Sequence, residues 1–300
     1  MNVFLGEVAK HLAGHWARLV VLPGLLYIAV LVAAYPLTPW RSDVAMADAL
    51  DLALVPDHLR AIAADIRGSG AAAMAAVAVF LLVGALLLGQ AAGGMATFVE
   101  RFWLGVWPSR AAEASARRRR QAWAAYESRI HALLTPPTSP IRLAAVAAYR
   151  MRQYKISLSP PQRPTWMGDR MASVETQIED TYSVPLRSCW PHLWMVMPDR
   201  ARQDLQTAAQ RFREQAVVAG WGCLAVAAAV YWWPVAIVVP GFLLVAWRRG
   251  RDGLDQFAQL VEAAFDLYAA ELARALGIAV PGQMTATEGA EMAEVVVKYE

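Results

Sequence analysis

The sequence is short of the residue patterns that most often carry chemistry. It contains two cysteines, Cys189 and Cys223, among its 300 residues, so no disulfide framework is implied. HExxH, CxxC, GxSxG and GxxxxGK[ST] patterns are all missing, as is a close carboxylate pair on a predicted pocket. We therefore expect neither an enzyme nor a protein with a bound cofactor.

Three residues near the N-terminus are potential metal ligands. Glu7, His11 and His15 recur every four residues and would share one helical face, from which a carboxylate and two imidazoles could hold a divalent metal. The wet face of an interfacial helix carries the same residue types, and only His131 and His192 are available elsewhere in the predicted cytoplasmic part. We predict no metal site.

Charge is missing from the apolar runs. No charged residue lies between Val217 and Trp247, whereas arginines crowd both sides of this stretch, and two further apolar runs cover residues 19–35 and 71–94. Ion-coupled transporters need ionisable groups near the middle of the membrane. Their absence from these runs argues against a secondary transporter.

What the chain does have is apolar residues gathered into runs, which predicts a polytopic membrane protein. Hydrophobic residues make up 57% of the sequence, and the mean hydropathy is +0.33. Positive charge collects on the cytoplasmic side of membrane segments, so a run that is basic at both ends enters and leaves by the same face. Twenty-five arginines against three lysines, with abundant alanine, suggest a high-GC bacterial source. We expect an inner-membrane protein with both termini in the cytoplasm.

The apolar runs divide into two predicted transmembrane hairpins. The first covers residues 19–94 and includes an acidic, partly helical outer loop at 36–70. Residues 216–247 form the second, whose spans of about 23 Å are short, so a re-entrant hairpin that does not cross stays open. Residues 1–18 fit an interfacial helix. A cleaved signal peptide is disfavoured, because its apolar region is usually about 7 to 15 residues long.

The remaining sequence predicts cytoplasmic helices, and no segment alternates long enough with a strand period to indicate a sheet. Residues 95–215 carry eighteen Lys or Arg against ten Asp or Glu, and we expect a basic helical domain there. One helix begins near Ser109, with its hydroxyl as N-cap, and another follows a proline-rich break. A helix capped by Asp199 runs without interruption into the third span. The expected fold is all-α, with four spans and this cytoplasmic domain.

Residues 248–300 are predicted to form a cytoplasmic helix and an acidic tail, with five basic residues against nine acidic ones. Beyond Gly253, apolar residues recur on one helical stripe that suits either packing on the cytoplasmic domain or a coiled seam between chains. The last twenty residues are polar and are expected to be loosely held. The stripe consists of Leu254, Val261, Phe265, Tyr268 and Leu272.

Arginines and tryptophans supply the candidate contact residues of the basic domain. Arg117, Arg118, Arg119 and Arg120 lie close to the second span, where clustered cations contact anionic lipid or form a solvated helix face. No nucleic-acid reader fold or glycine-rich phosphate loop accompanies them, so a nucleic-acid partner is not expected. Three tryptophans suit either a core or a docking surface for a protein partner: Trp166, Trp190 and Trp194.

Small residues predict close helix packing in the membrane. Gly89 and Gly93 form a GxxxG pair with Gly84 one turn or so before, and the third span has a small-residue face with Gly220 and Gly222. Packing within the chain explains these faces, and association between protomers in a homo-oligomer is the alternative.

A moderately specific motif resembles a known group. The segment PTWMGDRM at residues 164–171, followed by CWPHLWMVMPD at 189–199, is similar to uncharacterised polytopic membrane proteins of actinobacteria and related bacteria. In that group a comparable PTxxGD…WPxLWxxxP segment precedes a hydrophobic hairpin and a helical tail, so the likeness covers about residues 164–278. It assigns no chemistry, and it implies structural importance for Asp169, Trp190, Pro191 and Trp194.

Taken together, these features favour a membrane-anchored scaffold, docking or regulatory protein. Its basic cytoplasmic helices would contact a protein partner or the anionic inner leaflet. The alternative is an oligomeric pore, channel or membrane-perturbing effector built from the small-residue faces.

Overall fold

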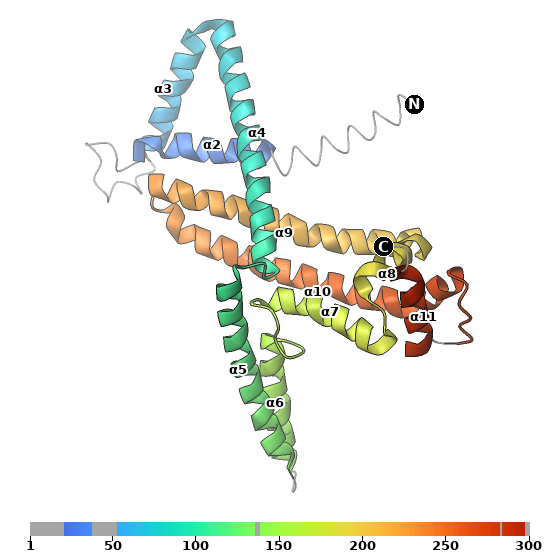
Figure 1. Ribbon diagram of the computed structural model, residues 1–300. Helices are drawn as coiled ribbons and strands as arrows, with labels where there is room; N and C mark the ends of the chain where they lie inside the picture. Colours follow the sequence, from blue (N-terminus) through green and yellow to red (C-terminus); the bar gives the residue numbers. More distant parts are fainter. Residues whose placement is uncertain (1–20, 38–52, 136–138, 283, 298–300) are drawn as a thin grey trace. The chain divides into compact units, whose positions relative to one another are not determined.

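The protein is all-α throughout the residues that the structure, a computed structural model, describes, namely 21–37, 53–135, 139–282 and 284–297 (Figure 1). No strand occurs in these ranges. The helices are α2 (Leu22–Ala34), the 3₁₀ turn η2 (Tyr35–Leu37), α3 (Leu54–Gly68), α4 (Gly70–Trp103), α5 (Ser109–Leu134), α6 (Pro140–Ile156), α7 (Trp166–Tyr182), α8 (Leu186–Val196), α9 (Asp199–Tyr231), α10 (Val235–Ala275) and α11 (Ala286–Val297).

The chain forms two compact units, each built from two stretches of sequence. Unit 1 comprises residues 1–99 and 213–249, and unit 2 comprises residues 100–212 and 250–300. The long helices α9 and α10 contribute residues to both units. The predicted interfacial helix at 1–18 and the first part of the predicted outer loop lie outside the described residues, whereas α3 supplies a helix in the later part of that loop.

Unit 1 is held together mainly by small residues. A Cβ on Gly24 of α2 would lie 2.5 Å from the carbonyl oxygen of Ala85 on α4, so the two backbones approach as closely as glycine allows. The hydroxyl of Tyr27 donates a hydrogen bond to the carbonyl of Leu224 on α9 at 3.0 Å, which ties α2 to α9. Large side chains such as Phe80 on α4 are exposed.

One helix of the described chain, α4, is long and apolar enough to cross a membrane. Its most apolar window has a mean hydropathy of 2.7, and only 6% of that window is buried. The helix α2 is apolar but has only 13 residues. The finding supports a single candidate span, and the four predicted spans remain a hypothesis.

Unit 2 encloses a conventional apolar core. Large side chains of α7, α8, α10 and α11 are buried against one another, with Leu193, Phe265 and Met292 almost fully inaccessible. Of the apolar stripe predicted beyond Gly253, Val261, Phe265 and Leu272 belong to this core and Tyr268 packs at its edge, whereas Leu254 is buried outside this cluster. Of the two predicted explanations for the stripe, packing on the helical domain is therefore the one that the structure contains.

The structure corrects parts of three local predictions. Residues 286–297 of the predicted loose tail form α11, which places Met292 and Val296, one turn apart, into the core of unit 2, whereas 298–300 lie outside the described residues. The helix predicted beyond Gly253 is present, but as the later part of α10, which continues unbroken from Val235 through Pro240 to Ala275. Ser109 is the first helical residue of α5 and not its cap, and its N-cap Pro108 makes no side-chain hydrogen bond.

Candidate docking surface and its supporting network

The four consecutive arginines of α5 do not share one environment. Successive residues of an α-helix are about 100° apart around the axis, so four in a row cannot all face solvent when one side of the helix is packed. Arg117 and Arg118 are exposed, whereas Arg119 is partly buried. Arg119 forms an ion pair with Asp169 and donates hydrogen bonds to the carbonyls of Ile156 and Arg163. Its guanidinium is therefore occupied inside unit 2, and the predicted contact role suits its exposed neighbours better.

Asp169 is the acceptor on which this network converges. Its carboxylate, on a residue only 4% exposed, accepts backbone N–H bonds from Gln162 at 2.8 Å and Arg163 at 2.6 Å, besides the ion pair with Arg119. Burial raises the pKa of Asp169, while the N–H donors and the positive charge of Arg119 act in the opposite direction. The network fixes the proline-rich loop between α6 and α7 to both α5 and α7.

The start of α7 is also closely packed against the end of α4. Thr165 caps α7 by accepting the N–H of Gly168 at 3.0 Å, and its hydroxyl donates to the carbonyl of Trp103 at 2.6 Å. A Cβ on Gly168 would lie 2.5 Å from the carbonyl oxygen of Leu104. Only glycine fits there without backbone movement, which gives the PTWMGDRM segment a packing function.

Arg170 ties α7 to α10 through two carboxylates. Its side chain is 5% exposed, and it donates to Asp255 and to Glu262 at 2.7 Å each. Burial acts to lower the pKa of Arg170, but the hydrogen bonds and charges of Glu262 and Asp255 raise it above its ordinary value. This cross-link lies beside the apolar core and links two helices that are far apart in the sequence.

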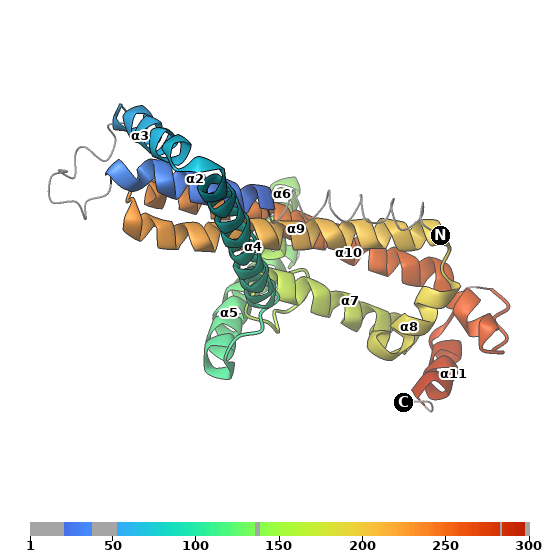
Figure 2. The same ribbon diagram turned by 90° about the horizontal axis from the view of Figure 1, so that it is seen from above.

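The three predicted tryptophans belong to two places in unit 2. Trp166, at the start of α7, stacks under the guanidinium of Arg251, which lies 3.9 Å from the ring centroid. Trp190 and Trp194 are one turn apart on α8, with ring centroids 6.1 Å apart, and are packed against the edge of the core. Trp166 is the first residue of α7, whereas α8 lies near the opposite end of that helix (Figure 2).

A strongly basic part of unit 2 is the helical hairpin of α5 and α6, residues 109–156, which we call the basic hairpin. It carries ten basic residues and two acidic ones, a net charge of +8. Arg129 lies 5.8 Å from the ring centroids of both Tyr126 and Tyr149, which joins the two helices. Ile141 and Met151 of α6 are exposed among its arginines. Only the arginine run of α5 had been predicted as a contact surface, although the basic residues of α6 are equally visible in a charge count for each helix.

The predicted packing glycines fall into three classes, all within unit 1. Gly220 and Gly222 lie at close contacts, because a Cβ would meet the carbonyl oxygen of Ala92 at 2.6 Å and the Leu243 side chain at 2.5 Å, respectively. Gly84 faces the Ile28 side chain at an ordinary distance, and Gly89 is buried. A Cβ on Gly93 would meet nothing, so a packing role for Gly93 remains a prediction about contacts between protomers.

Metal binding has no support among the described residues, in which no group of three potential ligands comes together. Glu7, His11 and His15 lie outside the described ranges, and the prediction about them stays a prediction. Comparison with protein-family models, curated proteins and solved structures found no match to this chain. The resemblance inferred from the PTWMGDRM segment therefore also stays a hypothesis.

Proposed function

We propose that the chain is a membrane-anchored docking protein without enzymatic activity. Unit 1 lies in the bacterial inner membrane, and unit 2 lies in the cytoplasm with both chain ends. The observation that carries this proposal is the exposure of α4, whose apolar window is only 6% buried. A core helix of a soluble protein would be mostly buried, and a signal sequence would lie near the N-terminus. The bilayer is the solvent that accommodates such a surface.

In this proposal the other helices of unit 1 lie in the membrane together with α4, because they pack against it. The contacts of Gly24 with Ala85, and of Gly220 with Ala92, bring α2 and α9 against α4. Small residues at helix contacts with large apolar ones outside are the arrangement that membrane helices favour. The arginines that follow the apolar part of α10 favour the cytoplasmic side for the ends of this hairpin.

The basic hairpin is the docking element, and the anionic inner leaflet is the partner that its side chains favour. Arg117 and Arg118 on α5 and Arg142 on α6 are exposed, as are the apolar Ile141 and Met151. A surface that mixes cations with protruding apolar side chains suits the headgroup region, where each cation near an anionic leaflet gains about 1 kcal/mol. An acidic protein surface is the rival partner.

Limited trypsin digestion in nanodiscs tests both parts of the proposal. The full chain is reconstituted with phosphatidylcholine alone or with added phosphatidylglycerol, and cleavage after Arg117 and Arg118 is followed by mass spectrometry. We expect phosphatidylglycerol to slow this cleavage and added salt to restore it. Equal cleavage rates in the two lipids would exclude lipid docking and leave the protein partner. Recovery of the chain in carbonate-soluble fractions would exclude the membrane anchor.

Charge reversal of the exposed arginines gives the matched variant. Arg117→Glu with Arg118→Glu removes cations from the surface while Arg119 keeps its pair with Asp169. Trypsin does not cleave after glutamate, so cleavage after Arg150, an exposed residue of α6 in the same hairpin, is followed in this variant and in the unaltered chain. We expect the double variant to fold and to lose the protection of Arg150 by phosphatidylglycerol. Arg187 is exposed in unit 2 but lies outside the basic hairpin, so Arg187→Glu serves as the control and should keep the protection.

A further inference from the structure

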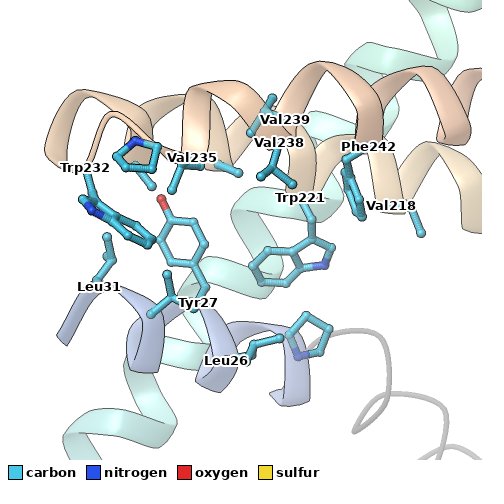
Figure 3. Close-up of a pocket in the computed structure, with 15 residues that line it drawn as sticks. Leu26, Tyr27, Leu31, Val218, Trp221, Trp232, Val235, Val238, Val239 and Phe242 are labelled. Carbon is cyan, nitrogen blue, oxygen red and sulfur yellow. The ribbon is translucent and has the colours of Figure 1, made fainter. Parts of the chain in front are cut away.

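Unit 1 contains an apolar cavity of about 520 Å³ between α2 and the hairpin of α9 and α10. All of its lining side chains are aliphatic or aromatic, and none carries a charge. Figure 3 shows Leu26 and Tyr27 of α2 on one side, with Trp221 and Val238 on the other. The Tyr27 hydroxyl is occupied by its hydrogen bond to the Leu224 carbonyl. The cavity volume falls within the range of about 300–1,000 Å³ that is common for small-molecule sites, and the apolar lining favours a hydrocarbon ligand.

A second, more polar pocket of about 600 Å³ adjoins this cavity. The two share Tyr27, Leu31 and Ala228 as walls, and the second adds Tyr35 and His58. The imidazole of His58 on α3 stacks on the Tyr35 ring, with 5.6 Å between centroids. An elongated ligand that filled the apolar cavity would therefore have an imidazole near one of its ends.

We propose that unit 1 binds one amphiphile with a hydrocarbon chain. The chain occupies the apolar cavity, and the polar headgroup lies beside His58. This site rests on the membrane placement of unit 1 proposed above. Leu26 and Val238 line the cavity and are also exposed, so the cavity is continuous with the apolar exterior. A lipid chain already in the bilayer enters sideways without crossing water, which makes a membrane lipid the favoured occupant over a soluble apolar compound.

Photolabelling of the full chain tests the site. The protein is reconstituted in liposomes of phosphatidylethanolamine and phosphatidylglycerol with diazirine-labelled palmitic acid, and the labelled peptides are mapped by mass spectrometry. We expect label on α2 and on the adjoining parts of α9 and α10. Ala225→Phe fills the cavity from α9 and should lower this labelling about tenfold, equivalent to ~1.4 kcal/mol of binding.

A neighbouring residue provides the matched control. Val226 is next to Ala225 on α9, is 51% exposed and does not line the cavity, so Val226→Phe should leave the labelling unchanged. Val238→Trp narrows the cavity from its exposed rim and should also lower the labelling, which covers the case in which Ala225→Phe fails to fold. If the unaltered chain and all three variants are labelled equally, and the label also spreads evenly over α4, then the labelling reflects ordinary lipid contact. That result would overturn the proposal.

The polar end has its own test. His58→Ala should lower labelling by palmitic acid but not by a diazirine-labelled hexadecane, which has no headgroup. Unchanged labelling by both probes would refute the headgroup position. Flotation of the liposomes distinguishes failure of the membrane anchor from failure of the lipid site. A chain that fails to float refutes the membrane anchor, whereas a chain that floats without local labelling refutes only the lipid site.

Discussion

The two units expose comparable apolar side chains in opposite structural settings. Leu87 in unit 1 is 65% exposed and Leu267 in unit 2 is 67% exposed. Around Leu87, the buried neighbours along α4 are small, as at Ala85 and Ala92, and the large side chains face outward. Around Leu267, the large Phe265 is fully buried and the exposed leucine is an isolated exception. Exposure of one residue therefore says little, whereas the small size of the side chains buried beside Leu87 is what favours the proposed lipid-facing surface of α4.

The units also differ in the cross-links that hold them. Unit 2 combines its apolar core with the buried ion pairs of Arg170 and Arg119, each satisfied by more than one partner. The described part of unit 1 has no charged residue between Gly68 and Val99, and its α2 and α9 are joined by the hydrogen bond from the Tyr27 hydroxyl to Leu224 and by contact of the Tyr27 and Trp221 rings. Electrostatic substitutions should therefore act on unit 2 stability and on unit 1 insertion, which are separate measurements.

Removal of the buried guanidinium in unit 2 should have the largest effect. Arg170→Ala leaves Glu262 and Asp255 without their shared cation, and loss of one partner of a buried ion pair costs about 3–5 kcal/mol. Hydrogen exchange of the full chain should show lost protection in α7 and in the later part of α10. Arg118→Ala, on an exposed residue, should change stability by less than about 0.5 kcal/mol. Equal protection in both variants would show that the Arg170 cross-link is not needed.

The next largest effect is expected from a charge on the outer surface, which should matter in unit 1 but not in unit 2. Leu87 lies near the middle of the uncharged run of α4, so Leu87→Lys should disfavour membrane insertion by about 3 kcal/mol. Leu267→Lys places the same charge at a site of similar exposure and should change neither insertion nor folding. The membrane-bound fraction of each variant after carbonate extraction gives the comparison. If Leu87→Lys were retained as well as Leu267→Lys, unit 1 would not be lipid-facing at that position.

Two predicted packing glycines, Gly93 on α4 and Gly220 on α9, test how closely the helices of unit 1 pack. Gly220→Ala directs its Cβ at the carbonyl of Ala92, a backbone atom that cannot turn aside, and overpacking of this kind costs about 1–3 kcal/mol. Gly93→Ala meets open space and should not lower stability, because alanine is more favourable than glycine within a helix by up to about 1 kcal/mol. Denaturant unfolding in detergent compares the two. A large loss for Gly93→Ala would indicate that Gly93 packs against a second protomer.

The secondary structure was more predictable than the site, because the two depend on different information. Proline breaks are local signals, and the break at 135–140 predicted the helix that follows it, α6. The helix predicted from Asp199 into the apolar run is unbroken, although Asp199 is its first residue and not its cap. The partner of Arg119 is Asp169, fifty residues away, and no periodicity records such a pairing. The geometry of four consecutive helical residues does predict that one arginine of the cluster faces inward, but not which carboxylate it meets.

The packing of α11 also depends on residues that are distant in the sequence. Three glutamates in α11 favoured a loose tail, yet Met292 and Val296 share one face and fill the core. Gly289 permits the approach, since a Cβ there would overlap the carbonyl oxygen of Tyr182. A two-residue apolar face is too weak a local signal to predict a packed helix, and the complementary surface on α7 and α8 supplies the rest.

The smallest expected effect concerns alkaline pH, and it is confined to unit 2. Burial, the hydrogen bond to Asp266 and the charge of Asp266 raise the pKa of Tyr182 from 10.0 to about 12 in the folded chain. Below pH 10 the phenol is protonated in both states, and between pH 10 and about 12 only the unfolded chain loses this proton. Stability should therefore fall through this interval, and Tyr182→Phe should flatten the fall. Because burial is the largest cause of the raised Tyr182 pKa, Asp266→Asn should remove only part of this fall in stability. Denaturant unfolding of the three chains across this pH range measures the slopes, and identical slopes would mean that Tyr182 ionises alike in the folded and unfolded chains.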